Sequence, residues 1–299
     1  MVIDKENDYV TYNDEQHLYI EKASGKKCIS VTTLIESFGQ PFDSDFWASY
    51  KALESLIGEE EYEKIKKDLL KKKKFDPKIL DNYNITMPRF LEEKTIILDN
   101  WKNKNKEACE RGTKIHKQME NLTLSGKCQE LQRLGLGGKF ECRTNNKIEL
   151  NGSGVYPEIL LNYTSPDGTL RLAGQADLVI VQGTNLYILD FKTNQEIKKG
   201  SYYNAATKSR QMMQYPLNHI QDCNFWHYTL QLSTYAWMIQ KQYPELEVKL
   251  LQLIHYDHND KVTFYDCEYR KDDVERMLKF YGSKIKREEQ YEKLKPIVY

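Results

Sequence analysis

Two short apolar segments separated by a turn constrain the fold of this 299-residue chain more than any other feature. Residues 174–181 and 186–191 are rich in Leu, Ile and Val, and the Gln-Gly-Thr-Asn sequence between them favours a turn. The first segment carries Asp177, and the second leads into Asp190 and Lys192. The pattern predicts a β-hairpin in which the two carboxylates approach one point. Lys192 should project beside Asp190, because residues i and i+2 share one face of a strand.

Two carboxylates and a lysine at the end of a buried strand are typical of metal-assisted chemistry on a phosphodiester. Hard oxygen ligands suit Mg²⁺, which activates water and offsets charge on the phosphate. The acid-x-Lys pattern alone is unspecific, and we interpret its other occurrences as solvent-exposed charge: Asp76–Lys78, Glu92–Lys94, Glu196–Lys198 and Glu247–Lys249. Asp190 and Lys192 differ because they close an apolar run, where an unpaired charge would be costly.

Three further motifs flank the hairpin. Residues 111–120 contain Gly-Thr-x-x-His-x-x-x-Glu, which places His116 and Glu120 one helical turn apart. Glu158 precedes the first strand of the hairpin, and residues 231–235 follow the pattern Gln-x-x-x-Tyr. Considered alone, His116 is better explained as a half-buried core histidine. Beside the other motifs, a neutral imidazole becomes a reasonable additional metal ligand.

In this order the motifs resemble those of the PD-(D/E)XK nuclease superfamily, and in particular its RecB-like, Cas4-like and mitochondrial genome-maintenance exonucleases, including phage- or virus-encoded members. The resemblance covers residues 111–237. It implies an α/β fold with a restriction-endonuclease-like mixed β-sheet core flanked by helices, here with a helical N-terminal segment. It also implies Mg²⁺-dependent hydrolysis of DNA in replication, recombination or repair, with Mn²⁺ able to substitute.

The resemblance assigns roles to individual residues. Those expected to hold the metal are His116, Asp177, Asp190 and the Phe191 carbonyl. Those expected to take part in catalysis are Asp177, Asp190, Lys192 and Glu158, with Glu158 contacting the metal directly or through water and Lys192 orienting or helping to deprotonate the attacking water. Those expected to contact the substrate are Gln231, Tyr235, Arg111 and Thr193, while Glu120 supports the ligands. A helix–sheet hydrogen bond is the alternative for Gln231 and Tyr235, and a surface ion pair is the alternative for Asp177.

The charge balance restricts where a nucleic acid can bind. The 44 basic and 44 acidic residues cancel, so any nucleic-acid surface must be local. Residues 195–228 interleave lysines and arginines with tyrosines, which suits phosphate contacts combined with base stacking on a single strand. An ordinary basic loop is the alternative. We expect the partner to be DNA that is single-stranded or has a free end, and the sequence does not identify replication or recombination partner proteins.

The cysteines bear on cofactor and compartment. Some Cas4-like proteins hold an iron–sulfur cluster through one upstream cysteine and three clustered after Gln-x-x-x-Tyr, whereas only Cys267 follows Tyr235 here. Because such a cluster normally takes four thiolates, we expect none. The six cysteines lack paired spacing and indicate reduced thiols of an intracellular, cytoplasmic protein, in the host cytoplasm if phage-encoded, with no membrane association.

We predict a single nuclease domain over residues 1–299. Its parts are an N-terminal hairpin and helical segment (1–105), the core motifs (106–245) and a C-terminal strand and helix (246–299). Two other functions stay open: a structure-specific endonuclease, and a catalytically silent nuclease fold that binds DNA or assembles with partners. Cleavage polarity, strand preference, DNA versus RNA and oligomeric state are not determined by the sequence.

Overall fold

The contacts within the chain divide it into two compact units. The computed structural model describes residues 5–69, 71, 74–135, 141–144, 147–148, 153–204, 208–259 and 261–294. Residues Pro41–Arg111 form one unit, and Met1–Gln40 together with Gly112–Tyr299 form the other. We predicted one domain with a helical N-terminal segment. The apolar side chains of the helical segment pack on one another in a cluster of their own, and the single-domain boundary stays a prediction.

The unit of residues 41–111 is helical, and residues 41–105 of it lie within the stretch 1–105 for which a hairpin and a helical segment were predicted. It contains α2 (Ser44–Ile57), α3 (Glu59–Leu69), the 3-10 helix η1 (Pro77–Tyr83) and the first part of α4 (Met87–Leu124). The Asp43 side chain caps α2 by accepting a hydrogen bond from the Phe46 amide at 2.9 Å. The core of this unit consists of buried residues from these helices and from the loop before α4: Tyr50, Ala52, Leu53, Tyr62, Leu69, Leu80, Ile85 and Phe90.

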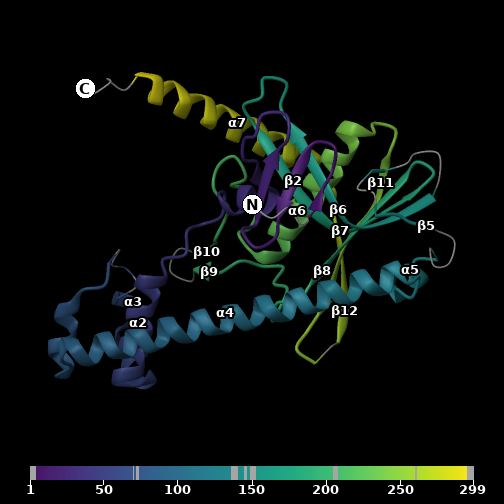
Figure 1. Ribbon diagram of the computed structural model, residues 1–299. Helices are drawn as coiled ribbons and strands as arrows, with labels where there is room; N and C mark the ends of the chain where they lie inside the picture. The colour runs from purple at the N-terminus through teal and green to yellow at the C-terminus, as the bar shows by residue number, and fades with distance from the viewer. Residues whose placement is uncertain are drawn as a thin grey trace. The chain divides into compact units, whose positions relative to one another are not determined.

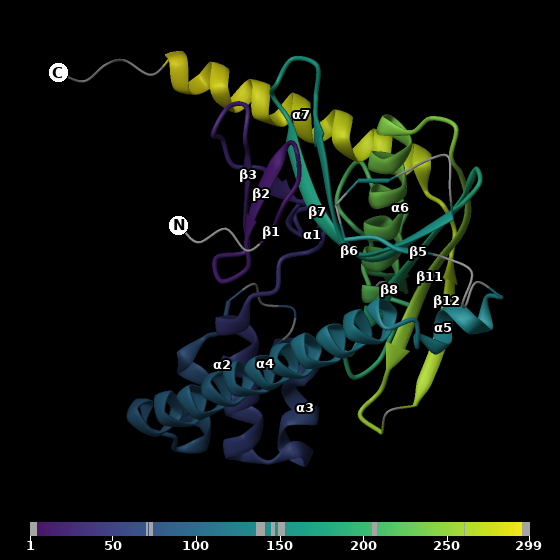
Figure 2. The same cartoon turned by 45° about the vertical axis from the view of Figure 1, so that its right-hand side comes forward.

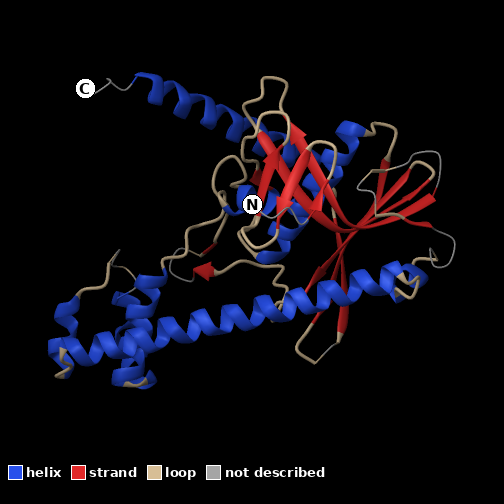
Figure 3. Ribbon diagram, viewed as in Figure 1, coloured by secondary structure: helices blue, strands red, loops and turns tan. Residues whose placement is uncertain are grey.

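The larger unit is built on a mixed, seven-stranded sheet with the order β12-β11-β8-β7-β6-β5, and β4 pairs with β7 (Figures 1 and 3). The strands are β4 (Ile29–Ser30), β5 (Glu141–Cys142), β6 (Ser153–Thr164), β7 (Arg171–Gln182), β8 (Asn185–Lys192), β11 (Glu247–Tyr256) and β12 (Val262–Cys267). Neighbours β6, β7 and β8 run antiparallel, whereas β8 and β11 run parallel. The predicted hairpin is therefore β7–β8, and the α/β class is confirmed.

Helices cover both faces of this sheet (Figure 2). On one face, here called the α6 face, α1 (Val31–Glu36), α6 (Asn224–Gln242) and α7 (Lys271–Leu294) pack over the largest apolar cluster. On the opposite face, here called the α4 face, the part of α4 from Gly112 onward and α5 (Gln129–Arg133) pack over a second cluster that includes Leu178 and Leu189.

Smaller elements complete the larger unit. The N-terminal strands β1 (Lys5–Glu6), β2 (Val10–Asn13) and β3 (Leu18–Glu21) form a three-stranded sheet that packs against Leu160 and Ala173 of the main sheet. Strands β9 (Tyr203–Asn204) and β10 (Ser209–Arg210) form a separate hairpin. Within the described residues, none of the helices combines the length and apolar character needed to cross a membrane.

Candidate functional site

The two longest strands change face where Glu158 and Asp177 lie. On β7, Ala176 packs into the cluster on the α6 face, but Leu178 packs into the cluster on the α4 face. In a regular strand these two side chains would share a face. On β6, Glu158 has φ 52°, and the register places it opposite Asp177. This left-handed conformation is uncommon for a residue with a side chain and costs about 1–3 kcal/mol, which the surrounding structure must offset.

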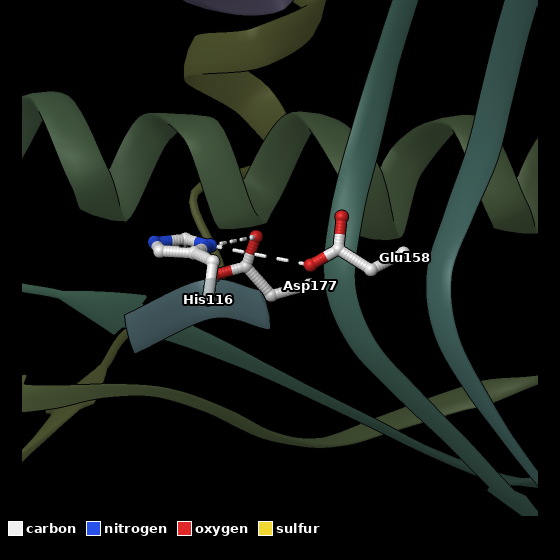
Figure 4. Close-up of side chains that lie close together, drawn as sticks. All are labelled: His116, Glu158 and Asp177. Atoms are coloured by element: carbon white, nitrogen blue, oxygen red, sulfur yellow. Dashed lines mark ion pairs between the residues drawn. The ribbon is translucent and has the colours of Figure 1, made fainter. Parts of the chain in front are cut away.

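Three side chains from different elements converge at this point. His116 of α4 points its Nδ1 at Asp177 Oδ1, 3.4 Å away, and at Glu158 Oε1, 4.0 Å away (Figure 4). One ligand atom from each residue lies within 4.8 Å of the others. The side chain of His116 is 32% exposed, that of Asp177 is 10% exposed and that of Glu158 is 15% exposed. The group is therefore mostly buried, but solvent still reaches it. Two carboxylates and an imidazole at this separation suit a divalent cation such as Mg²⁺ or Mn²⁺.

A second group lies on the α6 face at the end of β8. The Lys192 ammonium is 2.5 Å from Asp190 Oδ2, and Asp190 is 2% exposed. Lys192 also donates to Gln231 Oε1 at 3.3 Å and lies 4.5 Å from the centre of the Tyr228 ring. The Gln231 amide donates to the Tyr235 hydroxyl at 3.1 Å and to Asp190 Oδ1 at 3.5 Å. The side-chain amide of Gln231 on α6 thus holds both Asp190 and Lys192 in place.

Asp177 connects the two groups. The ladder between β7 and β8 extends from Gln182–Asn185 to Leu178–Leu189, and there it stops. Beyond that point the Phe191 amide donates to Asp177 Oδ2 at 2.7 Å, while Asp177 Oδ1 faces His116. The carboxylate therefore takes the place of a main-chain acceptor as the two strands diverge. Its other oxygen, Oδ1, faces His116 and Glu158.

Burial and mutual charge shift the pKa values of the site. Burial and the charge of Asp177 raise the pKa of Glu158 to about 7. Burial raises the pKa of Asp190 to about 6 despite Lys192. The charge of Asp177 raises the pKa of His116 to about 9. Burial alone would raise the pKa of Asp177, but His116 and Lys192 hold it below its usual value. At neutral pH the metal-free site therefore carries a proton on His116.

Lys192 is also protonated at neutral pH. Burial favours the neutral amine, but the charges of Asp190 and Asp177 outweigh it and hold the pKa of Lys192 above its usual value. A side chain in this state serves as a fixed positive charge and a hydrogen-bond donor. In the metal-free protein, the raised pKa of Lys192 disfavours proton abstraction.

The remaining predicted residues lie around these groups. Glu120 forms an ion pair with Lys117 at 2.7 Å, and its charge contributes to the raised pKa of Glu158. A Cβ on Gly112 would lie 3.3 Å from Thr193 Oγ1, so glycine at this position lets α4 approach the end of β8. Arg111 belongs to the unit of residues 41–111. Its contact with substrate, that of Thr193 and the metal contact of the Phe191 carbonyl stay predictions.

Three residues of the site were not predicted. Gln175 donates to Glu158 Oε2, and Lys5 of β1 lies 3.5 Å from the same oxygen. Gln175 precedes Asp177 by two residues on a strand, and Tyr228 precedes Gln231 by three residues on α6. The periodicities of a strand and of a helix could therefore have predicted that both lie at the site. Lys5 has no such signal, because a separate sheet brings it to the site.

Comparisons with known proteins add little. No family model and no curated protein sequence matches the chain. One similar solved structure, of a protein designated SSO0001, is 15% identical over 44% of this chain and half of its own length, with a TM-score of 0.27. Another, named "Putative exonuclease" and from Eubacterium rectale, is 9% identical over 87% of this chain and 80% of its own, with a TM-score of 0.32. Likeness this low carries no argument about activity.

Proposed function

We propose that this protein is a metal-dependent nuclease that hydrolyses phosphodiester bonds in DNA, with Mg²⁺ as its cofactor and Mn²⁺ as a substitute. The observation that carries the proposal is the convergence of His116, Glu158 and Asp177 beside the buried pair of Asp190 and Lys192. The motif order supports the same conclusion, because it resembles that of PD-(D/E)XK exonucleases. The expected substrate is single-stranded DNA or a DNA end.

In this proposal some residues bind the metal ion and Lys192 supplies positive charge. His116, Glu158 and Asp177 would hold the divalent ion, and Asp190 lies beside them on the next strand. When bound, the ion lowers the pKa of a water molecule and offsets charge on the phosphate. Lys192, fixed between Asp190 and Gln231, orients the attacking water and stabilises negative charge that develops on the phosphorus oxygens. Its raised pKa favours this role over proton abstraction.

Gln231 and Tyr235 act through the charged pair in this proposal. They are 7% and 3% exposed, and their hydrogen bonds go to Lys192, Asp190 and each other. A Cβ on Gly174 would lie 2.7 Å from the Tyr235 ring, so glycine at this position makes room for the ring. We therefore assign them to positioning Asp190 and Lys192. Direct contact with DNA would require them to become exposed.

Metal dependence tests the proposal most simply. Mg²⁺ and Mn²⁺ should support cleavage of labelled DNA, and Ca²⁺ should bind but support it poorly, because its looser coordination positions water less well. Release of labelled nucleotides after dialysis against EDTA and addition of each ion measures this. Full activity in EDTA would contradict the metal site. DNA binding without turnover in Mg²⁺ or Mn²⁺ would favour the silent binding module instead.

The shape of the DNA distinguishes attack on ends from internal cutting. The families that the motifs resemble are largely exonucleases that thread one strand past the metal. We therefore expect linear single-stranded DNA to be degraded to short products, and covalently closed circles of the same sequence to survive at equal enzyme concentration. Gel analysis of both substrates in one reaction is the measurement. Equal rates on circles and linear strands would replace the exonuclease with the endonuclease alternative.

A further inference from the structure

The segment that connects β8 to α6 presents three tyrosines to solvent. Tyr202, Tyr203 and Tyr215 are 67%, 50% and 68% exposed. Tyr202 and Tyr203 are consecutive, and the segment that carries them begins directly after Lys192 and Thr193. Two consecutive aromatic side chains left exposed, such as Tyr202 and Tyr203, are typical of a binding surface, since burying them would be favourable.

The backbone that carries Tyr202 and Tyr203 is ordered by several hydrogen bonds. Tyr203 pairs with Arg210 in the β9–β10 hairpin, and the Gln211 amide donates to the Tyr202 carbonyl at 2.9 Å. Arg210 Nη1 donates to the carbonyl of Ser201, which is 6% exposed, at 2.7 Å. The guanidinium carbon lies 5.8 Å from the centre of the Tyr203 ring. Both tyrosines therefore extend from an ordered backbone.

The β9–β10 hairpin is attached to α6, the helix that holds Lys192. Asp222 Oδ2 accepts hydrogen bonds from the Gln40 amide at 2.6 Å and from Gln211 Nε2 at 3.1 Å. Its other oxygen lies 2.7 Å from Nε2 of His227, one turn before Gln231 on α6. The hairpin is thus coupled through one buried carboxylate to the element that positions the charged pair.

The charge of this segment is opposite to that of a nucleic acid. Residues 193–223 contain four basic residues, Lys198, Lys199, Lys208 and Arg210, and two acidic residues, Glu196 and Asp222, in a chain whose net charge is zero. Lys199 lies over the rings of Phe225 and Tyr265, at 5.2 and 5.4 Å from their centres, which fixes its ammonium near the surface. Local positive charge beside exposed aromatic rings is the combination that binds unpaired nucleotides.

We infer that Tyr202 and Tyr203, with Lys199, Lys208 and Arg210, form a platform for single-stranded nucleic acid. Unpaired bases would stack on the tyrosines while the cations contact the phosphates. Bases inside a duplex are already stacked on one another, so the platform should favour a single strand. The inference deepens the proposed nuclease function by assigning the binding of the single-stranded substrate to these residues, and it rests on that function only for what happens after binding.

The test measures binding without cleavage. Fluorescence anisotropy of a labelled oligothymidylate is recorded in EDTA with the wild-type chain and with the double variant Tyr202→Ala/Tyr203→Ala. Removing two stacking rings should weaken binding by at least about tenfold and leave the salt slope unchanged. Lys199→Gln with Lys208→Gln should instead reduce that slope by about 1.4, since each phosphate that a lysine neutralises contributes about 0.7. Tyr291→Ala, at a tyrosine 70% exposed on α7, is the matched control and should bind normally.

The outcomes separate this inference from the nuclease proposal. Normal oligothymidylate binding by a folded tyrosine double variant, with a wild-type melting temperature, would overturn the platform even if the protein cleaves DNA. An equal weakening on a blunt duplex would overturn the preference for single strands, and no binding by the wild-type chain at low salt would overturn the platform altogether. Tyrosine-dependent binding by a protein that cleaves nothing in Mg²⁺ or Mn²⁺ would uphold the platform and refute the nuclease.

Discussion

Replacing Asp190 with Asn, or Lys192 with Ala, should lower DNA cleavage by at least about a hundredfold, because each change removes a charge that acts at the transition state. The two side chains lie 2.5 Å apart, and Asp190 is 2% exposed. Initial rates on labelled linear DNA, at saturating Mg²⁺, give the measurement. The double variant should be little worse than the worse single variant, because the two residues act as a unit.

The chain supplies its own control for this experiment. Glu247 and Lys249 have the same acid-x-Lys spacing on β11 and form an ion pair at 2.7 Å, but their side chains are 68% and 43% exposed. Glu247→Gln and Lys249→Ala should leave cleavage unchanged, since exposed pairs contribute little. Wild-type turnover by a folded Asp190 or Lys192 variant would show that the assignment of the site is wrong.

Stability must be measured alongside activity. Removing one partner of a buried ion pair leaves the other charge without compensation, at a cost of about 3–5 kcal/mol in other proteins. Asp190→Asn leaves Lys192 beside Asp177 alone, whereas Lys192→Ala can be relieved by protonation of Asp190, whose pKa is already raised to about 6. Asp190→Asn should therefore lower the melting temperature more at pH 6 than Lys192→Ala does.

Local sequence patterns predicted most of the fold. The β-hairpin was predicted from two apolar runs and a turn, and it is observed as β7–β8. The same-face placement of Asp190 and Lys192 follows from strand periodicity, and the proximity of Gln231 and Tyr235 follows from helical periodicity. Each of these relations spans only a few residues, so the sequence alone determines it.

Relations that depend on distant partners could not be predicted. The change of face at Glu158 and Asp177 is hidden because β7 is buried on both sides and shows no alternation. The left-handed backbone of Glu158 depends on its pairing with β7 and not on its neighbours in sequence. The sequence also does not show which helices share a core, because the apolar stripe of a helix does not identify its partner. The 38-residue α4 continues from one unit into the other.

Metal binding should strengthen steeply as the pH rises to about 9. The metal-free site holds protons on Glu158, with a pKa of about 7, and on His116, with a pKa of about 9. A bound ion must displace them, because ligands bind in their deprotonated forms. Apparent Mg²⁺ affinity should therefore rise by up to about a hundredfold per pH unit below pH 7 and by up to about tenfold per pH unit between pH 7 and 9, and then level off.

Calorimetry with Mg²⁺ in two buffers of different ionisation enthalpy counts the protons released and so tests these limits directly. His116→Ala should weaken binding and abolish the dependence above pH 7, because its proton is the one released there. Glu158→Gln should abolish the steeper dependence below pH 7 and keep the rest. Affinity that does not change with pH in the wild-type chain would exclude both residues as ligands.

The protons on His116 and Glu158 also affect the stability of the metal-free protein. This stability should fall as the pH rises, whereas the metal affinity should increase. The pKa of His116 is raised from 6.5 to about 9, so its ion pair with Asp177 stabilises the fold fully below pH 6.5, and this contribution is lost as the pH rises through 9. The pKa of Glu158 is raised from 4.5 to about 7, so its ionisation also destabilises the fold as the pH rises. The melting temperature without metal should therefore fall between pH 6 and 9, and Mg²⁺ should restore it most at pH 9, where its affinity is highest. A metal-induced increase in melting temperature that is largest at pH 6 would contradict this linkage, because a ligand that competes with protons stabilises most where the protons have already left.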